Sequence, residues 1–252
     1  FNVNSTACDK LAKDESASGC SDDTYSYVAK AEADALTAGK LTPAGASQPW
    51  KVIRSTDEFT QLASGSLKYS GPLLGSPNVA PNGTLQQGRQ TAIVGKDATT
   101  PSGEAYIRTV PTLKTMTEGA INHLSQNANG FSVMIEGGAT DWAAHTSNAC
   151  TGKGDWGNSY NPNCEGVEYG RLIEETADFN NAVSSVIAWV EKNSNWEETL
   201  LIVTTDHDNG MPMGPDAQKT AYEAISNKGK GQLPGISFRP TGNHSNALVP
   251  LW

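Results

Sequence analysis

Histidine is scarce in this sequence, and the positions of its histidines give the first chemical clue. The chain has 4 histidines in 252 residues. His145 follows Asp141 by four positions, a spacing that puts both side chains on one face of a helix. His207 directly follows Asp206, and His244 lies in a Gly- and Asn-containing loop. Because carboxylate oxygen and imidazole nitrogen are typical donors to zinc, these positions are candidate metal ligands.

A further carboxylate, Glu136, precedes Gly137 and Gly138, and an isolated carboxylate suits a harder ion such as magnesium. The whole candidate set is Glu136, Asp141, His145, Asp206, His207 and His244. Singly, each has an ordinary interpretation as a turn or capping residue. Together they exceed the needs of one four-coordinate zinc and indicate a site for several metal ions. His123 lies on an apolar helical stripe without a neighbouring carboxylate, so we expect it to be structural.

Two apolar runs are expected to position these ligands. Residues 131–135 and 200–203 are predicted buried strands that lead into Glu136 and Asp206. Apolar residues at helical spacing predict a long helix over 173–190, and strand–helix–strand order predicts a right-handed parallel crossover. Ligands collect at the carboxyl ends of such strands. The predicted fold class is therefore α/β, with a central, mostly parallel sheet flanked by helices on both faces and incomplete in this chain.

The remaining pattern predicts one α/β domain over 1–252, with a loop-rich part (1–110) and a metal-binding core (111–252). Other predicted elements are a helix over 25–38, a strand over 50–53, a capped helix from Ser55, a Gly- and Pro-rich excursion over 66–104 with short strands such as 91–94, and a helix from Pro111 that ends at Asn129-Gly130.

Charge and cysteine content restrict the class of protein. A net charge of −9 argues against nucleic acid or an anionic membrane as a partner, and no apolar run approaches the ~20 residues of a membrane span. Cys8 with Cys20, and Cys150 with Cys164, each bracket a polar loop. Two disulfides in a periplasmic or secreted protein are the favoured interpretation. The alternative is a Cys-rich metal site, but the sequence has no Cys-x-x-Cys motif to support it. The ends at Phe1 and Trp252 lead us to expect a piece of a longer protein.

Three segments resemble alkaline phosphatases in order and spacing. They are Gly130–Asp141 with the following His145, Ile202–His207, and Thr241–Ala247. The resemblance extends from about Val110 to Trp252 and is loose before that. It implies a phosphomonoester hydrolase with two zinc ions and one magnesium ion. Asp141, His145 and His244 would bind the first zinc, Asp206 and His207 the second, and Glu136 the magnesium.

Family members also use a Ser nucleophile in an Asp-Ser-Ala motif, which forms a phosphoserine intermediate, and an Arg that binds phosphate. The segment Asp14-Glu15-Ser16-Ala17 lies inside the first cysteine loop, whereas a nucleophile belongs at a strand-to-helix turn, so we reject it. We expect the nucleophile, the Arg and the remaining magnesium ligands upstream of Phe1, and little or no activity from residues 1–252 alone. Trp142 stands where the resemblance implies Lys or His in contact with phosphate through water, so phosphate affinity and rate are expected to differ. The alternative is that the Trp142 ring serves only for packing.

The resemblance implies small phosphomonoesters and inorganic phosphate as ligands, and it leaves a homodimer open. Two alternatives remain at this point. The chain could belong to another metal-dependent phosphoesterase of the same superfamily, although such enzymes lack the Glu-Gly-Gly run before Asp141. It could also be a secreted metal-binding module without catalytic activity.

Overall fold

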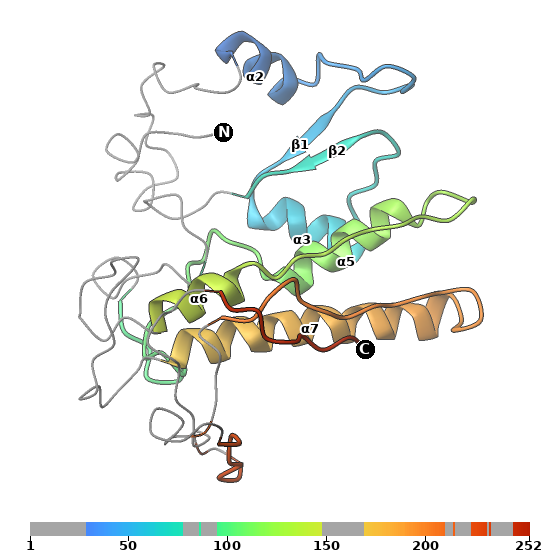
Figure 1. Ribbon diagram of the computed structural model, residues 1–252. Coiled ribbons are helices and arrows are strands. Elements are labelled where there is room, and N and C mark those ends of the chain that lie inside the picture. The colour runs from blue at the N-terminus through green and yellow to red at the C-terminus, as the bar shows by residue number, and fades with distance from the viewer. Residues whose placement is uncertain are drawn as a thin grey trace.

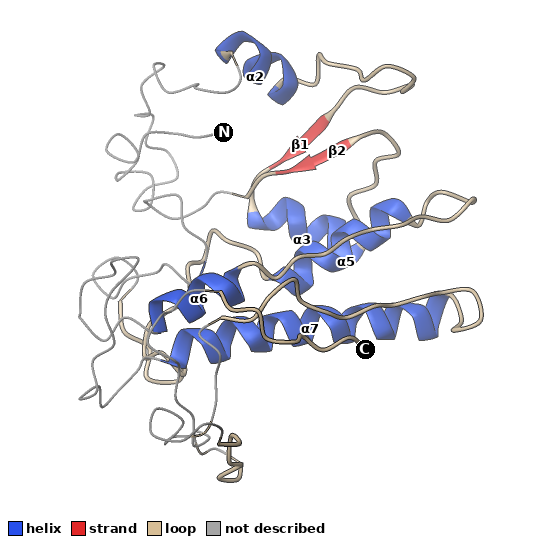
Figure 2. Ribbon diagram, viewed as in Figure 1, coloured by secondary structure: helices blue, strands red, loops and turns tan. Residues whose placement is uncertain are grey.

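The computed structural model describes residues 29–77, 86, 95–147, 169–209, 214, 223–230, 232 and 244–252. Its helices and strands are α2 (Lys30–Thr37), β1 (Lys51–Ile53), α3 (Thr56–Ser64), β2 (Leu73–Gly75), α5 (Leu113–Leu124), α6 (Ala139–Ser147) and α7 (Tyr169–Asn193). In Figures 1 and 2, β1 and β2 lie above α3 and α5, which in turn lie above the long α7. Helix α5 contacts both α3 and α7, and α6 packs on α7.

β1 and β2 are parallel, with Lys51 opposite Leu73 and Ile53 opposite Gly75, and α3 connects them. This small parallel sheet with helices agrees with the α/β class. Its core is the fully buried Ile53 with the nearly buried Phe59 and Leu62 of α3. Leu67, Leu73 and Met116 pack around that core. Burial of each large apolar side chain stabilises the fold by about 1.5–3 kcal/mol, so these contacts fix α3 and α5 against the sheet.

Helix α3 begins as the sequence predicts, at a capping box. The Ser55 hydroxyl accepts a hydrogen bond from the backbone N–H of Glu58, and the Glu58 carboxylate accepts one from the backbone N–H of Ser55 at 3.0 Å. These bonds satisfy N–H groups that have no partner inside the helix. The helix ends at Gly65, whose φ of 75° lies in the left-handed region that favours glycine. The predicted strand over 50–53 is also confirmed, as β1.

The other helix predictions are correct in kind and differ in their ends. Helix α5 begins at Leu113 with Thr112 as its cap, rather than at Pro111. It ends at Leu124, before the predicted Asn129-Gly130, because the Asn127 side chain accepts the backbone N–H of Asn129 and stabilises a turn instead. Helix α7 covers the predicted 173–190. Of the predicted 25–38 helix, α2 forms over Lys30–Thr37, while residues 25–28 and the predicted strand 91–94 lie outside the described residues.

The two strands expected to carry the ligands are wrong as predicted. Residues 131–135 and 200–203 are extended but pair with no neighbouring strand in the described chain, and Met134 and Leu200 are 89% and 82% exposed. The first segment instead lies against α7, where the Phe131 and Trp189 rings meet edge to face at 5.8 Å. In the second, Val203 exchanges two backbone hydrogen bonds with Trp252, both at 2.9 Å. Among the described residues, no backbone hydrogen bond joins residues 131–135 to residues 200–203, so the predicted parallel crossover does not form between them.

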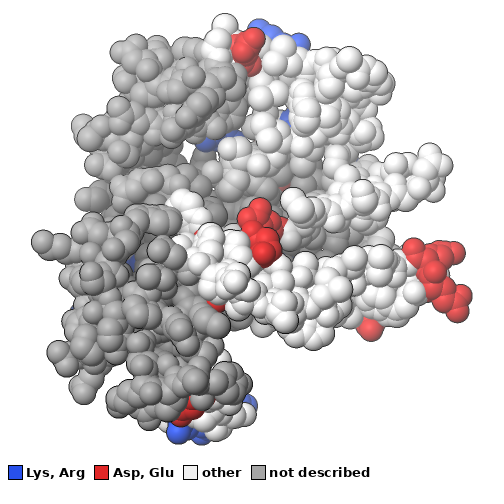
Figure 3. All heavy atoms as spheres, in the orientation of Figure 1, with Lys and Arg blue, Asp and Glu red and all other residues white. Residues whose placement is uncertain are grey.

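The surface shown in Figure 3 carries scattered acidic side chains, some of which gather near the end of α7. No broad basic patch is visible among the described residues on this face. None of the helices that the structure describes combines the length and apolar character needed to cross a bilayer.

Candidate metal centre

Helix α6 places Asp141 and His145 on one face, as their spacing predicts. The His145 Nε2 lies 3.4 Å from the Asp141 Oδ1. Two glycines precede α6, which packs on α7. A Cβ at Gly137 would lie 2.6 Å from the Phe179 ring, and one at Gly138 would lie 3.1 Å from the Glu136 carboxylate. Of the two glycines, Gly137 is therefore the one that allows the close approach to α7, while Gly138 leaves room for the Glu136 side chain.

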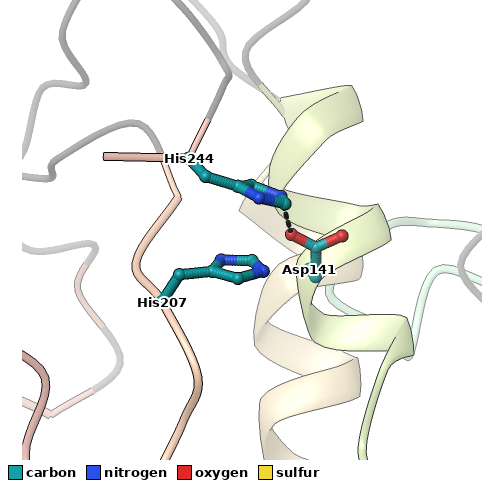
Figure 4. Close-up of side chains that lie close together, drawn as sticks. All are labelled: Asp141, His207 and His244. Carbon is teal, nitrogen blue, oxygen red and sulfur yellow. Dashed lines mark hydrogen bonds and ion pairs between the residues drawn. The ribbon is translucent and has the colours of Figure 1, made fainter. Parts of the chain in front are cut away.

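Two segments far apart in sequence bring the other imidazoles to this helix. Asn209 and His244 form an antiparallel β-bridge, which sets the segment after His207 beside the segment that contains His244. The rings of His207 and His244 stack with centroids 3.4 Å apart and planes inclined by 21°. Figure 4 shows both rings directed toward Asp141 on α6.

Asp141, His207 and His244 form a trio whose donor atoms all lie within 4.8 Å of one another. The His244 Nε2 is 3.0 Å from the Asp141 Oδ1 and 3.1 Å from the His145 Nε2. Asp141 and His207 are partly buried, while His244 is exposed. One carboxylate with up to three imidazoles in this space is a donor set that suits zinc. The trio and His145 therefore fit a divalent metal ion.

The remaining predicted ligands lie outside the trio. The Asp206 side chain is 85% exposed, with its Oδ2 3.4 Å from the His207 Nε2. Glu136 is exposed, and its carboxylate lies over Gly138. The structure brings His207 to Asp141 and His244, although the resemblance assigns His207 to the second zinc. How the ligands divide between ions, and whether Glu136 binds magnesium, stay predictions.

Residues that the sequence analysis did not single out hold these ligands in place. The Asn209 amide donates to the Asp141 Oδ1 at 2.8 Å and to the Asp141 carbonyl oxygen at 3.3 Å. The Asp208 carboxylate accepts hydrogen bonds from the backbone N–H and the hydroxyl of Ser245, the residue after His244. The sequence feature that could have indicated these residues is the unbroken polar run Asp206-His207-Asp208-Asn209. Metal ligands are normally oriented by hydrogen-bonded neighbours, so polar residues next to a candidate ligand are candidates for that role.

The model of the alkaline phosphatase family matches residues 86–155, the part of the chain that contains Glu136, Asp141 and His145. This part of the chain is similar to the alkaline phosphatase family. Among alkaline phosphatases, that of Escherichia fergusonii is 31% identical over 131 residues, which cover 52% of this chain and 23% of the relative. Alkaline phosphatase H of Pseudomonas aeruginosa is 28% identical over 201 residues, or 76% of this chain and 36% of the relative.

A third relative, the streptomycin-6-phosphate phosphatase of Streptomyces griseus, is 25% identical over 181 residues, or 69% of this chain and 34% of that protein. The chain thus spans about a quarter to a third of the length of these three relatives. All three are named as phosphatases.

Proposed function

We propose that this chain forms the metal-binding part of a phosphomonoester hydrolase that uses two zinc ions and one magnesium ion. The observation that carries the proposal is the trio of Asp141, His207 and His244, which three separate segments bring within 4.8 Å. Similarity to the alkaline phosphatase family supplies the reaction class. Phosphomonoesters and inorganic phosphate are the proposed ligands.

In the proposed site, Asp141, His145 and His244 hold the first zinc, Asp206 and His207 hold the second, and Glu136 holds the magnesium. The His207 and His244 rings stack with centroids 3.4 Å apart, so two ions held by these imidazoles would lie close to each other. When bound, two such ions supply a clamp for the attacking and leaving oxygens of an in-line displacement on phosphorus.

The side chains of this chain have a defined task in that scheme. His145, His207 and His244 donate neutral nitrogen, and Asp141 and Asp206 donate anionic oxygen, so the ions keep part of their positive charge toward the substrate phosphate. Trp142, 51% exposed on α6, offers neither a cation nor an oxygen to phosphate. We therefore propose weaker phosphate binding at this position than in relatives that carry Lys there.

The natural protein that contains this sequence provides the test. Dialysis against a chelator should abolish hydrolysis of p-nitrophenyl phosphate, and zinc with magnesium should restore it. The His145→Gln variant should require far more zinc for the same recovery, whereas His123→Gln, on α5, should behave as the unmodified protein. Activity on bis-p-nitrophenyl phosphate but not on the monoester would favour another phosphoesterase of the superfamily. Stoichiometric zinc binding without turnover would indicate a non-catalytic metal-binding module.

A periplasmic or secreted location is proposed as well, on the basis of the paired cysteines. All of them, Cys8, Cys20, Cys150 and Cys164, lie outside the described residues, so the support is their sequence spacing alone.

A further inference from the structure

The segments that carry His207 and His244 are joined by a contact between the residues that follow them. The Asp208 Oδ1 accepts the backbone N–H of Ser245 at 3.2 Å and also the Ser245 hydroxyl. The same hydroxyl oxygen accepts the backbone N–H of Ala247 at 3.1 Å. Asp208 and Ser245 are both partly buried. The Ser245 hydroxyl therefore has a donor role toward Asp208 and an acceptor role toward Ala247, which fixes its orientation.

We propose that Asp208 is a positioning residue whose carboxylate, by binding Ser245, holds His207 and His244 in the arrangement that binds metal. The proposal rests on the proposed function, since it concerns the same metal centre. His207 and His244 each directly precede one partner of this contact, so a rotation of either segment would have to break it. We call the contact between Asp208 and Ser245 the clasp.

The clasp acts in addition to the backbone bridge between Asn209 and His244. The bridge sets the two segments side by side but leaves the rotation of each imidazole to its local surroundings. A charge-assisted bond to both the N–H and the hydroxyl of Ser245 restrains the segment ends more strongly than a neutral bond. Ligands that are ordered before the metal arrives lose less conformational freedom on binding, and this raises the affinity.

A negative charge at Asp208 would also attract a cation without any clasp, and two substitutions separate these effects. Asp208→Asn removes the charge but keeps a side-chain oxygen that can accept from Ser245. Ser245→Ala removes the hydroxyl but leaves the charge. If positioning dominates, Ser245→Ala weakens metal binding and Asp208→Asn retains more affinity than Asp208→Ala. If charge dominates, Ser245→Ala has no effect and Asp208→Asn is as weak as Asp208→Ala.

The experiment titrates zinc into the full metal-free chain in competition with a chromophoric chelator. We expect Asp208→Ala to weaken zinc binding by about 10–100-fold, Ser245→Ala by about 10-fold, and Ser245→Thr, which keeps the hydroxyl, by less than either. Ser55→Ala, which removes the α3 cap far from the site, is the matched control for lost stability and should not change zinc affinity. The proton spectra of the metal-free chain give a second measurement: contacts between the His207 and His244 rings should weaken in Asp208→Ala and persist in Ser55→Ala.

The outcomes separate this inference from the function on which it rests. Zinc affinity in Asp208→Ala within twofold of the unmodified chain would overturn the clasp and leave the phosphatase proposal standing. Unchanged affinity in Ser245→Ala would overturn it in the same way, in favour of a charge effect. Failure of the unmodified chain to bind zinc would overturn both proposals.

Discussion

Asp141 receives contacts from three side chains at the metal centre. Its Oδ1 lies 3.0 Å from the His244 Nε2 and 3.4 Å from the His145 Nε2, and it accepts the Asn209 amide at 2.8 Å. An anionic oxygen at the meeting point of several neutral imidazoles adds the negative charge that attracts a cation to this place. Asp141 is therefore the residue whose loss should affect the site most.

The Asp141→Ala variant should weaken zinc binding by at least roughly 100-fold. Loss of a residue that only hydrogen-bonds to a ligand can cost that much, and Asp141→Ala removes a proposed donor atom itself. Chelator competition with the full chain measures the change. His123→Gln is the control, since His123 lies on α5 with its Nδ1 buried and without a hydrogen-bond partner in the described chain. Equal loss in both variants would mean that unfolding, and not ligand removal, explains the effect.

At the scale of the element, the first turn of α3 links helix stability to pH. The backbone N–H of Arg54 donates to the Glu58 carboxylate at 2.9 Å, and the backbone N–H and hydroxyl of Ser55 add to it. Despite partial burial, which acts in the opposite direction, these bonds hold the pKa of Glu58 below its usual value. A lowered pKa in the folded state means that the ionised carboxylate stabilises the fold, fully so above the pKa of the unfolded chain.

Replacement of Glu58 by Gln should reduce the free energy of unfolding by a few tenths of a kcal/mol at pH 7, because the helix terminus loses a negative charge. The difference from the unmodified chain should shrink as the pH falls from about 4.3, the usual Glu pKa, through the lower pKa of folded Glu58. Ser55→Ala should cost more, about 1 kcal/mol. Urea unfolding at several pH values measures both, and a Glu58→Gln difference that grows toward acid pH would contradict the argument.

The N-terminal end of α7 is held by the loop before α5. Arg171 pairs with Glu104, and the Glu174 carboxylate accepts the backbone N–H of Ser102 at 2.7 Å. Gly170 makes this approach feasible, because a Cβ there would lie 2.5 Å from the Ser102 Cα and 2.6 Å from the Pro101 carbonyl oxygen. Both atoms belong to the backbone, which cannot rotate away as a side chain can.

Gly170→Ala should therefore destabilise the chain by about 1–3 kcal/mol, although Ala in a helix is normally better than Gly by up to about 1 kcal/mol. Gly119→Ala on α5 is the matched control, since its nearest neighbour is the flexible Leu62 side chain at 3.2 Å. Its cost should be clearly smaller. Denaturant midpoints of the two variants compare them, and stabilisation by Gly170→Ala would show that α7 and the loop do not meet as described.

At the scale of the whole molecule, the predicted disulfides bear on the compartment in which the protein works. Peptide mapping of the natural protein without reduction should recover Cys8 linked to Cys20, and Cys150 linked to Cys164. Each bridge would close a polar loop and reduce the conformational freedom of the unfolded chain. Free thiols would contradict the prediction. Thiolates that release zinc on acidification would contradict it as well and would favour a Cys-rich metal site. Alkylation before and after acid treatment distinguishes these results.

The helices of this molecule were predictable from the sequence, whereas the strands near the candidate site were not. Ser55 with Glu58, and the apolar stripes of α5 and α7, are local signals, in which a few neighbouring residues determine a helix start or face. They predicted the helices well. The segments 131–135 and 200–203 have the composition of buried strands, yet lie extended and largely exposed, because composition does not supply a hydrogen-bonding neighbour. The parallel unit forms instead at β1 and β2.

The sequence by itself determined the donor types at the candidate metal centre, the helical pairing of Asp141 with His145, and the resemblance of the surrounding motifs to alkaline phosphatases. Only the tertiary structure decided that His207 lies against His244 and Asp141, and that Asp208 and Asn209 hold the neighbouring segments. The physical reason is distance along the chain. A spacing of four within one helix is fixed by the helical repeat, whereas the approach of residues a hundred positions apart depends on packing that no local pattern encodes.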